Sequence, residues 1–497
     1  MAPVLRTPAP FAGFTVVLAI MAVPLAAQAA DWRLTPTVGA SATYSDNANQ
    51  SATNPEDALI LSVTPGFTLR SSGSRRVQAT LQYGLSAVER FGNNESNDLN
   101  HNLNAAGKAE LVEDFLFIDG NARISQELIS LLGSPADADI NSSNRATVGT
   151  YSISPYIQKR LGSFANTLVR YTASGAIFEN DVAAQSASNS LTASLNSGPR
   201  FNDLSWGLNY AIRKTQNDNA VDTTFESASA SAGYALTRKF RVFGTVGEDR
   251  NDYLSATKTT GSFYSAGFGW SPTRRTSVEA SAGERYFGKT YSLSARHRTR
   301  LSNWNVSYAE DVSDSSRFLP KNGTVYDYLC PGSNGNILIT DWIFSIPPAP
   351  NCLAFGGTPG VLFDLRNGVF ISKIFRAGMS WGISRVTYSL NYSDSKRLFT
   401  ADNSEDQTQS LLASADYRMT PLTTLNSSIV LTRTQTPASV VLTARDDDLL
   451  SLSLGLNHRF AETLNGALTF RHTQRDSNAA NSDYDENSLT ATVNMRF

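Results

Sequence analysis

The sequence ends in Asn-Ser-Leu-Thr-Ala-Thr-Val-Asn-Met-Arg-Phe, residues 487–497, and this stretch decides the fold. Apolar residues alternate with polar ones along it, and the last residue is the aromatic Phe497. Successive side chains of a β-strand point to opposite faces, so this strand has one apolar face and one polar face. A lipid-facing apolar side, a polar inner side and a terminal aromatic are typical of the closing strand of an outer-membrane β-barrel. We therefore interpret Phe497 as the C-terminal signal for barrel assembly.

The same alternation recurs from Trp32 to the C-terminus in about 22 stretches. Long polar linkers and short turns follow these stretches in turn, as in barrels that have long outer loops and short periplasmic turns. We predict an all-β fold, a single antiparallel up-and-down transmembrane barrel of about 22 strands (range roughly 18–24) with periplasmic termini. A soluble β-sandwich or propeller is the alternative, but it would bury two apolar faces and would not produce this asymmetry of loops.

Tryptophan supports the same orientation. Aromatic rings favour the membrane interface, where one end of the side chain is apolar and the other is wet. Five tryptophans occupy the same alternate positions as the apolar residues of their stretches, and they lie near the predicted periplasmic ends. These residues form the predicted periplasmic girdle: Trp32, Trp206, Trp270, Trp304 and Trp381.

The first residues have a different character. Arg6 gives a basic start, residues 14–23 are apolar, and Ala27-Gln28-Ala29 is a small-residue cleavage site. We predict that residues 1–29 are a cleaved signal peptide and that residues 30–497 form the barrel, a retained anchor helix being the alternative. No later stretch approaches the roughly 18 apolar residues of a spanning helix.

The only two cysteines, Cys330 and Cys352, lie in a polar segment rich in Pro and Gly, residues 313–367. In an exported chain they predict a disulfide, which would close a loop of roughly twenty residues and stabilise it by about 3 kcal/mol. We expect a long extracellular loop that folds over or into the pore, with an external flap as the alternative. The first predicted strand follows directly after the signal peptide, so this loop is the candidate constriction.

Charged residues that lie between the apolar positions of the predicted strands are predicted to face the lumen. They could form interior salt bridges, or their excess of bases could favour anionic solutes. The predicted lumen-facing charges are Arg70, Arg90, Lys108, Arg123, Arg170, Arg213, Arg241, Arg285, Arg296, Arg376, Glu110, Asp119 and Glu279.

Nothing in the sequence indicates catalysis. All four histidines share the apolar parity of their strands and lie near strand ends, which favours interfacial side chains over a catalytic group. We expect no catalytic, cofactor-binding or metal-binding residues, no cofactor and no enzymatic activity. The expected partners are outer-membrane lipid, lipopolysaccharide and the barrel-assembly machinery, with exopolysaccharide-export components as a further partner class; no nucleic acid is expected.

Three segments resemble a known family. They are Gly-Glu-Arg-Tyr-Phe-Gly-Lys-Thr-Tyr-Ser-Leu-Ser-Ala-Arg-His-Arg-Thr-Arg-Leu-Ser-Asn-Trp-Asn-Val-Ser at 283–307, Trp-Arg-Leu-Thr-Pro-Thr-Val at 32–38, and Asn-Gly-Val-Phe-Ile-Ser-Lys at 367–373. Together they resemble the outer-membrane proteins associated with the PEP-CTERM/exosortase system, a family of β-barrels. The resemblance implies a link to exopolysaccharide production and protein sorting, and it assigns no functional residues.

The sequence thus leaves three functional hypotheses. The first is an outer-membrane channel or scaffold associated with exopolysaccharide or PEP-CTERM surface-protein export in a Gram-negative bacterium. The alternative is a general diffusion porin for small solutes with a weak preference for anions. The third is a barrel enzyme.

Overall fold

The computed structural model describes residues 31–497, except 73–75, 93–95, 129–143, 179–184, 219–220, 315–324, 332–336, 343–352, 359–367 and 439–443. The predicted signal peptide therefore lies outside the described residues. No helix in the described ranges is long and apolar enough to cross a membrane.

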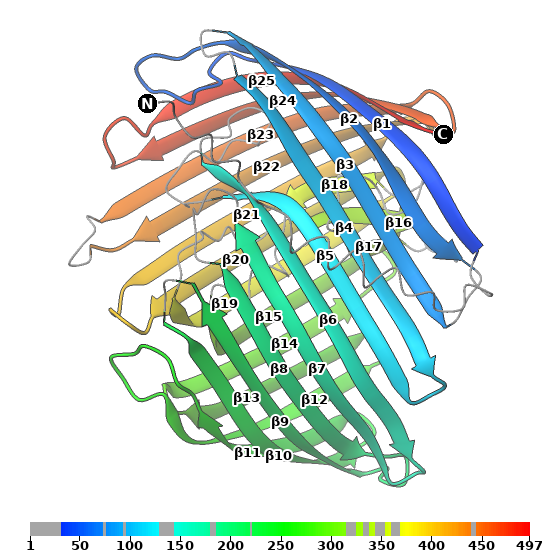
Figure 1. Ribbon diagram of the computed structural model, residues 1–497, viewed down its shortest axis with the longest axis vertical. Helices are drawn as coiled ribbons and strands as arrows, with labels where there is room; N and C mark the ends of the chain where they lie inside the picture. Colours follow the sequence, from blue (N-terminus) through cyan, green and yellow to red (C-terminus); the bar gives the residue numbers. More distant parts are fainter. Residues whose placement is uncertain are drawn as a thin grey trace, which may run out of the picture.

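Twenty-two antiparallel strands form one closed ring (Figure 1). The last strand pairs with the first, Thr37–Ser45 lying opposite Arg496–Ser488, so the ring has no free edge. The predicted fold class and strand number are confirmed. The barrel strands are β1 (Asp31–Ser45), β2 (Ala58–Ser72), β3 (Val77–Gly92), β4 (Ser96–Val112), β5 (Leu116–Leu128), β6 (Arg145–Leu161), β7 (Ala165–Phe178), β8 (Ser186–Ser197), β9 (Leu204–Asn217), β10 (Thr223–Thr237), β11 (Phe240–Arg250), β12 (Thr260–Thr273), β13 (Thr276–Arg285), β14 (Gly288–Arg298), β15 (Ser302–Asp314), β19 (Val369–Ile383), β20 (Val386–Phe399), β21 (Glu405–Arg418), β22 (Thr423–Thr436), β23 (Arg445–Arg459), β24 (Leu464–Ser477) and β25 (Tyr484–Arg496).

The two faces of the wall follow the sequence alternation. On the outer face of β25, Leu489 and Val493 are each 47% exposed and Phe497 is 64% exposed, as lipid-facing residues are in a chain without its membrane. On the inner face, hydroxyl groups of β1 pair with those of both neighbouring strands. Thr43 of β1 hydrogen-bonds Thr490 of β25 at 2.9 Å, and Ser41 hydrogen-bonds Ser62 of β2 at the same distance.

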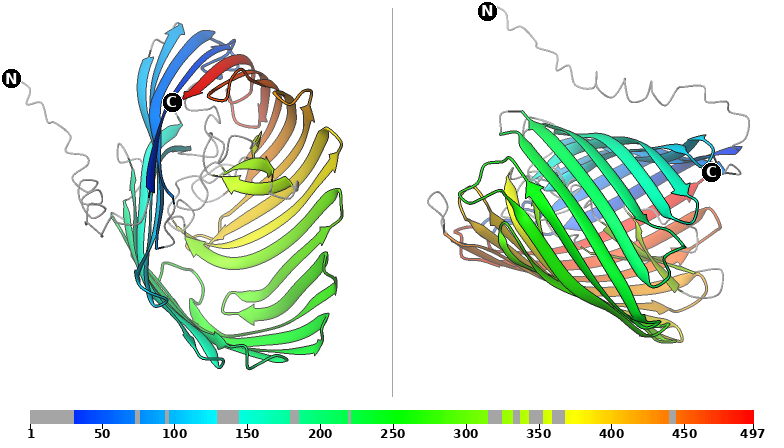
Figure 2. Two further views of the ribbon diagram at one scale, coloured as in Figure 1. Left: turned by 90° about the vertical axis from the view of Figure 1, so that its right-hand side faces the viewer. Right: turned by 90° about the horizontal axis from the view of Figure 1, so that it is seen from below.

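Three short strands between β15 and β19 form a separate sheet. They are β16 (Val325–Pro331), β17 (Ile337–Trp342) and β18 (Leu353–Thr358), with β16 in the centre. Figure 2 shows this sheet within the ring of barrel strands, where β18 lies beside β21. The sequence alternation did not indicate these strands. The side chains of Cys330 and Cys352 lie outside the described residues, and their disulfide stays a prediction.

The outer ends of β15 and β19 depart from the regular wall. Near the start of β15, Trp304 lies on the outer face and is 48% exposed. Val312 and Asp314 are separated from it by even numbers of residues and should share its face, but each is only 5% exposed. The Asp314 carboxylate forms an ion pair with Arg213, which lies on the lumen face of β9. Because these two strands are far apart in the ring, the outer end of β15 must bend into the lumen, and it carries β19, its paired neighbour, with it.

Candidate functional site: the charged lumen

The predicted lumen charges lie on the inner face, and six arginines among them form ion pairs there. The pairs are Arg90–Asp98, Arg123–Glu127, Arg170–Asp119, Arg213–Asp314, Arg241–Glu279, and Arg285 with both Asp249 and Asp311. Lys108 lies over the rings of Phe117 and Tyr156, and Glu110 accepts a hydrogen bond from the backbone N–H of Asp114. Arg70, Arg296 and Arg376 make no side-chain ion pair or hydrogen bond within the described part of the chain.

Two of these pairs, Arg170–Asp119 and Arg285–Asp249, share one arrangement. An arginine reaches across one strand to an acid on the next, and the intervening strand supplies an aromatic ring. Arg170 of β7 lies 3.9 Å from the ring centre of Tyr156 on β6 and reaches Asp119 on β5 at 2.9 Å. The alternation predicts which residues face inward, but the register and curvature of the sheet decide which acid each arginine meets.

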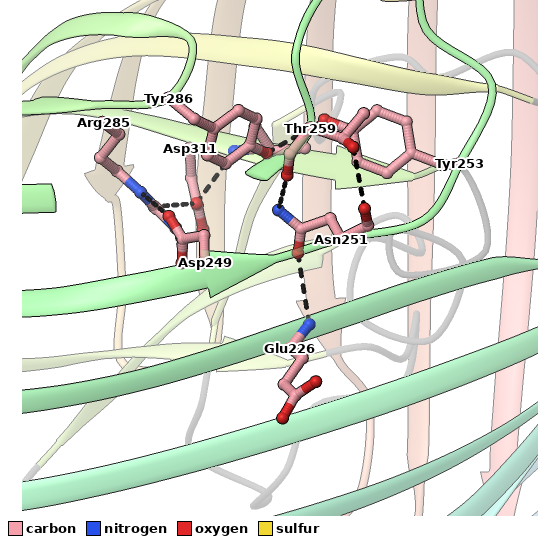
Figure 3. Close-up of polar contacts among 9 residues, drawn as sticks. Glu226, Asp249, Asn251, Tyr253, Thr259, Arg285, Tyr286 and Asp311 are labelled. Carbon is pink, nitrogen blue, oxygen red and sulfur yellow. Dashed lines mark hydrogen bonds and ion pairs between the residues drawn. The ribbon is translucent and has the colours of Figure 1, made fainter. Parts of the chain in front are cut away.

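The best-formed cluster lies near the outer end of β11 to β15 (Figure 3). The Arg285 guanidinium donates to both carboxylate oxygens of Asp249, at 3.0 and 3.1 Å, and to Asp311 at 2.9 Å. Asp249 is only 1% exposed, so this bidentate pair is shielded from solvent. Arg285 also lies over the rings of Phe263 and Phe287. The cluster thus links β11, β13 and β15 on the inner face of the barrel near their outer ends.

The β11–β12 loop, residues 251–259, folds over this cluster. Tyr253 is 8% exposed and packs against Val312 and Val369 of the inward-bent strands. Its hydroxyl hydrogen-bonds that of Tyr286 at 3.0 Å, and burial raises the pKa of both tyrosines, so both stay neutral. Farther along the loop, the N–H of Ala256 donates to the carbonyl of Thr400, beyond the end of β20, at 2.8 Å. The loop therefore crosses the outer mouth and ties β11 to β20.

The outer ends of other strands carry further buried ion pairs that sequence reasoning missed. Arg397 of β20 and Asp406 of β21 pair at 3.1 Å with side chains 5% and 7% exposed. Asp447 of β23 accepts from Arg475 of β24 at 2.7 Å and also pairs with Arg445. The alternation of the sequence indicates that these residues face the lumen. They were missed because they lie close to strand ends, where the sequence does not define the position of the strand.

The periplasmic end differs. Six inward arginines there were also missed, and no described group pairs with their side chains: Arg33, Arg160, Arg298, Arg418, Arg459 and Arg496. The pair Arg241–Glu279 near this end has side chains 55% and 49% exposed.

The predicted girdle residues lie on the outer face at the same rim. Trp32 lies near the start of β1 opposite Ser71, and Trp206 lies near the start of β9. Trp270 lies opposite Phe240, and Trp304 and Trp381 lie near the paired ends of β15 and β19.

The predicted interfacial histidines bond to neutral side chains. His101 contacts the Tyr83 hydroxyl, and the other three contact Thr276, Thr423 and Asn487. In the described ranges, no group of three or more His, Cys, Asp or Glu side chains could hold a metal ion. The arrangement shows polar and ionic contacts along a lumen, which suit passage or binding.

Comparison with known proteins supports the class. No family model matches the chain, and no curated protein matches it. Among solved structures, the siderophore receptor PirA from Acinetobacter baumannii is similar, with a TM-score of 0.52 at 8% identity over 94% of this chain and 80% of that one. A ferric enterobactin receptor (PfeA) mutant from Pseudomonas aeruginosa has a TM-score of 0.51 at 9% identity, with the same coverage.

At such low identity the likeness concerns the fold alone. The chain is thus an outer-membrane β-barrel of a Gram-negative bacterium, and it shares its barrel fold with these two proteins. Both similar structures are receptors.

Proposed function

We propose that this protein is a constricted outer-membrane channel for exopolysaccharide or surface-protein export, of the PEP-CTERM/exosortase-associated kind that its sequence resembles. The observation that carries the proposal is the outer mouth. There the β11–β12 loop and the bent ends of β15 and β19 lie across the lumen, held by Tyr253 and by the Arg213–Asp314 pair. A barrel of this many strands encloses a lumen that wall side chains alone do not fill, so a channel for a polymer needs segments that narrow it.

The test is deletion of the gene and rescue with the intact chain or with Tyr253→Ala. Loss of secreted polysaccharide or surface protein on deletion, restored by the intact chain, is the expected result. In planar bilayers we expect low conductance from the intact protein and a higher, noisier conductance from Tyr253→Ala, because the loop loses its buried anchor. Unchanged secretion on deletion would overturn the export proposal.

A second candidate is a diffusion porin with a weak preference for anions. The lumen-facing Arg70, Arg296 and Arg376, which have no partner among the described residues, favour it. A steady, large conductance in the intact protein, together with normal polysaccharide secretion after deletion, would select the porin. Hydrolysis of labelled lipid by the pure protein would instead revive the barrel enzyme.

The predicted disulfide gives a separate test of the constriction. The described strands β16–β18 lie inside the ring, so a covalent tie in this segment would limit their motion (Figure 2). We expect Cys330→Ser/Cys352→Ser to raise conductance fluctuations. The same conductance traces before and after reduction would argue against a role for this segment in the constriction.

A further inference from the structure

Five arginines lie on the lumen face near the periplasmic rim, around the seam where the barrel closes. They come from five strands in one sector of the ring: Arg33 of β1, Arg70 of β2, Arg418 of β21, Arg459 of β23 and Arg496 of β25. None makes a side-chain ion pair or hydrogen bond within the described residues. Trp32, next to Arg33, lies on the outer face at the membrane interface, which places these arginines at the periplasmic mouth.

Two of these arginines directly oppose each other. The register pairs Arg33 with Arg70 across β1 and β2, so their Cα atoms lie about 4.5–5.5 Å apart. Like charges directly opposite on one face of a sheet are destabilising, and no described carboxylate forms an ion pair with Arg33 or Arg70. A bound anion between the two guanidinium groups would turn that repulsion into two charge-assisted hydrogen bonds.

Amide side chains lie beside the arginines in a row across the seam. Arg459 lies opposite Asn465, Asn465 opposite Asn494, and Asn494 opposite Gly39. A Cβ at Gly39 would lie only 2.8 Å from the Asn494 side-chain oxygen, so the glycine provides room for the amide. The side chains of Asn465 and Asn494 make no hydrogen bond within the described residues. They are therefore available to sugar hydroxyls, as both donors and acceptors.

The balance of charge in this sector is basic. The nearby carboxylates are Asp31 at the start of β1, Asp416 on β21, Glu462 in the β23–β24 turn and the terminal carboxylate of Phe497 beside Arg496, still fewer than the five arginines. Asp416 accepts a hydrogen bond from Asn426, which is in turn bonded to Asn457. The arginines thus stay uncompensated, and the sector attracts anions from the periplasm.

We propose that this surface of arginines and asparagines, the seam patch, captures an acidic polysaccharide segment as it enters the lumen from the periplasm. Planar guanidinium groups match the carboxylates of uronic acid units, and the amides match their hydroxyls. An acidic protein segment offers the carboxylates without the hydroxyls, so the row of amides favours the polysaccharide. This inference rests on the proposed export function, for which it names the substrate class, and its test measures binding rather than transport.

The experiment titrates hexagalacturonate into the purified full-length barrel in detergent and measures binding by calorimetry. Arg33→Gln/Arg70→Gln and Arg418→Gln/Arg459→Gln should each weaken binding about tenfold or more, because charge-assisted hydrogen bonds are lost. The matched control is Arg296→Gln/Arg376→Gln, which removes two lumen arginines that also lack partners, on β14 and β19. It should change affinity by less than about twofold. Far-UV circular dichroism checks that every variant is folded.

Further probes separate the sources of anionic charge. Asn465→Leu/Asn494→Leu should weaken hexagalacturonate binding several-fold but leave the binding of polyphosphate unchanged. Polyglutamate that binds as tightly as hexagalacturonate, or equal losses from the control and the seam variants, would overturn the proposal. Binding that persists in a protein whose deletion leaves secretion normal would support the seam patch while refuting the export function.

Discussion

The two ends of the lumen handle charge in opposite ways. At the outer end, carboxylates such as Asp249 and Asp447 are buried and paired with arginines from neighbouring strands. At the periplasmic end, arginines such as Arg33 and Arg459 have no acidic partner within the described residues. The outer end also carries a folded loop and two inward-bent strand ends. The difference indicates that the outer end is built to hold a closed shape, whereas the periplasmic end keeps its charges available for a ligand.

The largest expected effect comes from removing a buried acid at the outer end. Asp447→Asn removes a buried carboxylate that pairs with both Arg475 and Arg445, so the free energy of unfolding should fall by about 3–5 kcal/mol. Urea titration of the barrel in lipid vesicles measures it. The control is Glu279→Gln, which breaks the exposed Arg241–Glu279 pair and should cost less than about 1 kcal/mol. Equal costs would remove the contrast between the two ends.

A smaller, local effect is expected at the β11–β12 loop. Tyr253→Ala removes a buried ring from its contacts with Val312 and Val369 and should cost about 3 kcal/mol, mostly as local opening. Hydrogen exchange at the Ala256 amide, which bonds the Thr400 carbonyl, measures that opening. Tyr253→Phe loses only the bond to Tyr286, worth about 1 kcal/mol, and is the matched control. Unchanged protection in Tyr253→Ala would mean that the loop is held elsewhere.

The smallest effect, and one of opposite sign, is expected at the periplasmic end. Arg70→Gln removes the repulsion with Arg33, so it should stabilise the barrel by a few tenths of a kcal/mol at low salt. The gain should vanish near 1 M salt, where the screening length is about 3 Å. Arg296→Gln, whose cross-strand neighbours are Ser277 and Asn305, should show no such gain. A destabilised Arg70→Gln would show that this arginine has a structural partner.

The lipid-facing side of the barrel could be predicted from individual residues. Leu489, Val493 and Phe497 were predicted to face lipid, and all three are exposed on the outer face. The girdle tryptophans share the alternation of the apolar residues, and the strand register places all five at the same end of the ring. By contrast, nothing local in the sequence indicated that Asp314 would meet Arg213, 101 positions away, or that Thr400 would bond Leu254.

The sequence by itself determined that about 22 alternating strands form one barrel and which side chains of the regular wall face lipid or the lumen, because a two-residue period is a local property of the backbone. The tertiary structure alone decided which charges pair, which stay open and where the wall bends inward. Those outcomes depend on strand register and on the curvature of a closed ring, which bring together residues that no local pattern relates. For that reason the lumen charges could be predicted from the sequence, but the contrast between an outer mouth crossed by a loop and a basic periplasmic mouth could not.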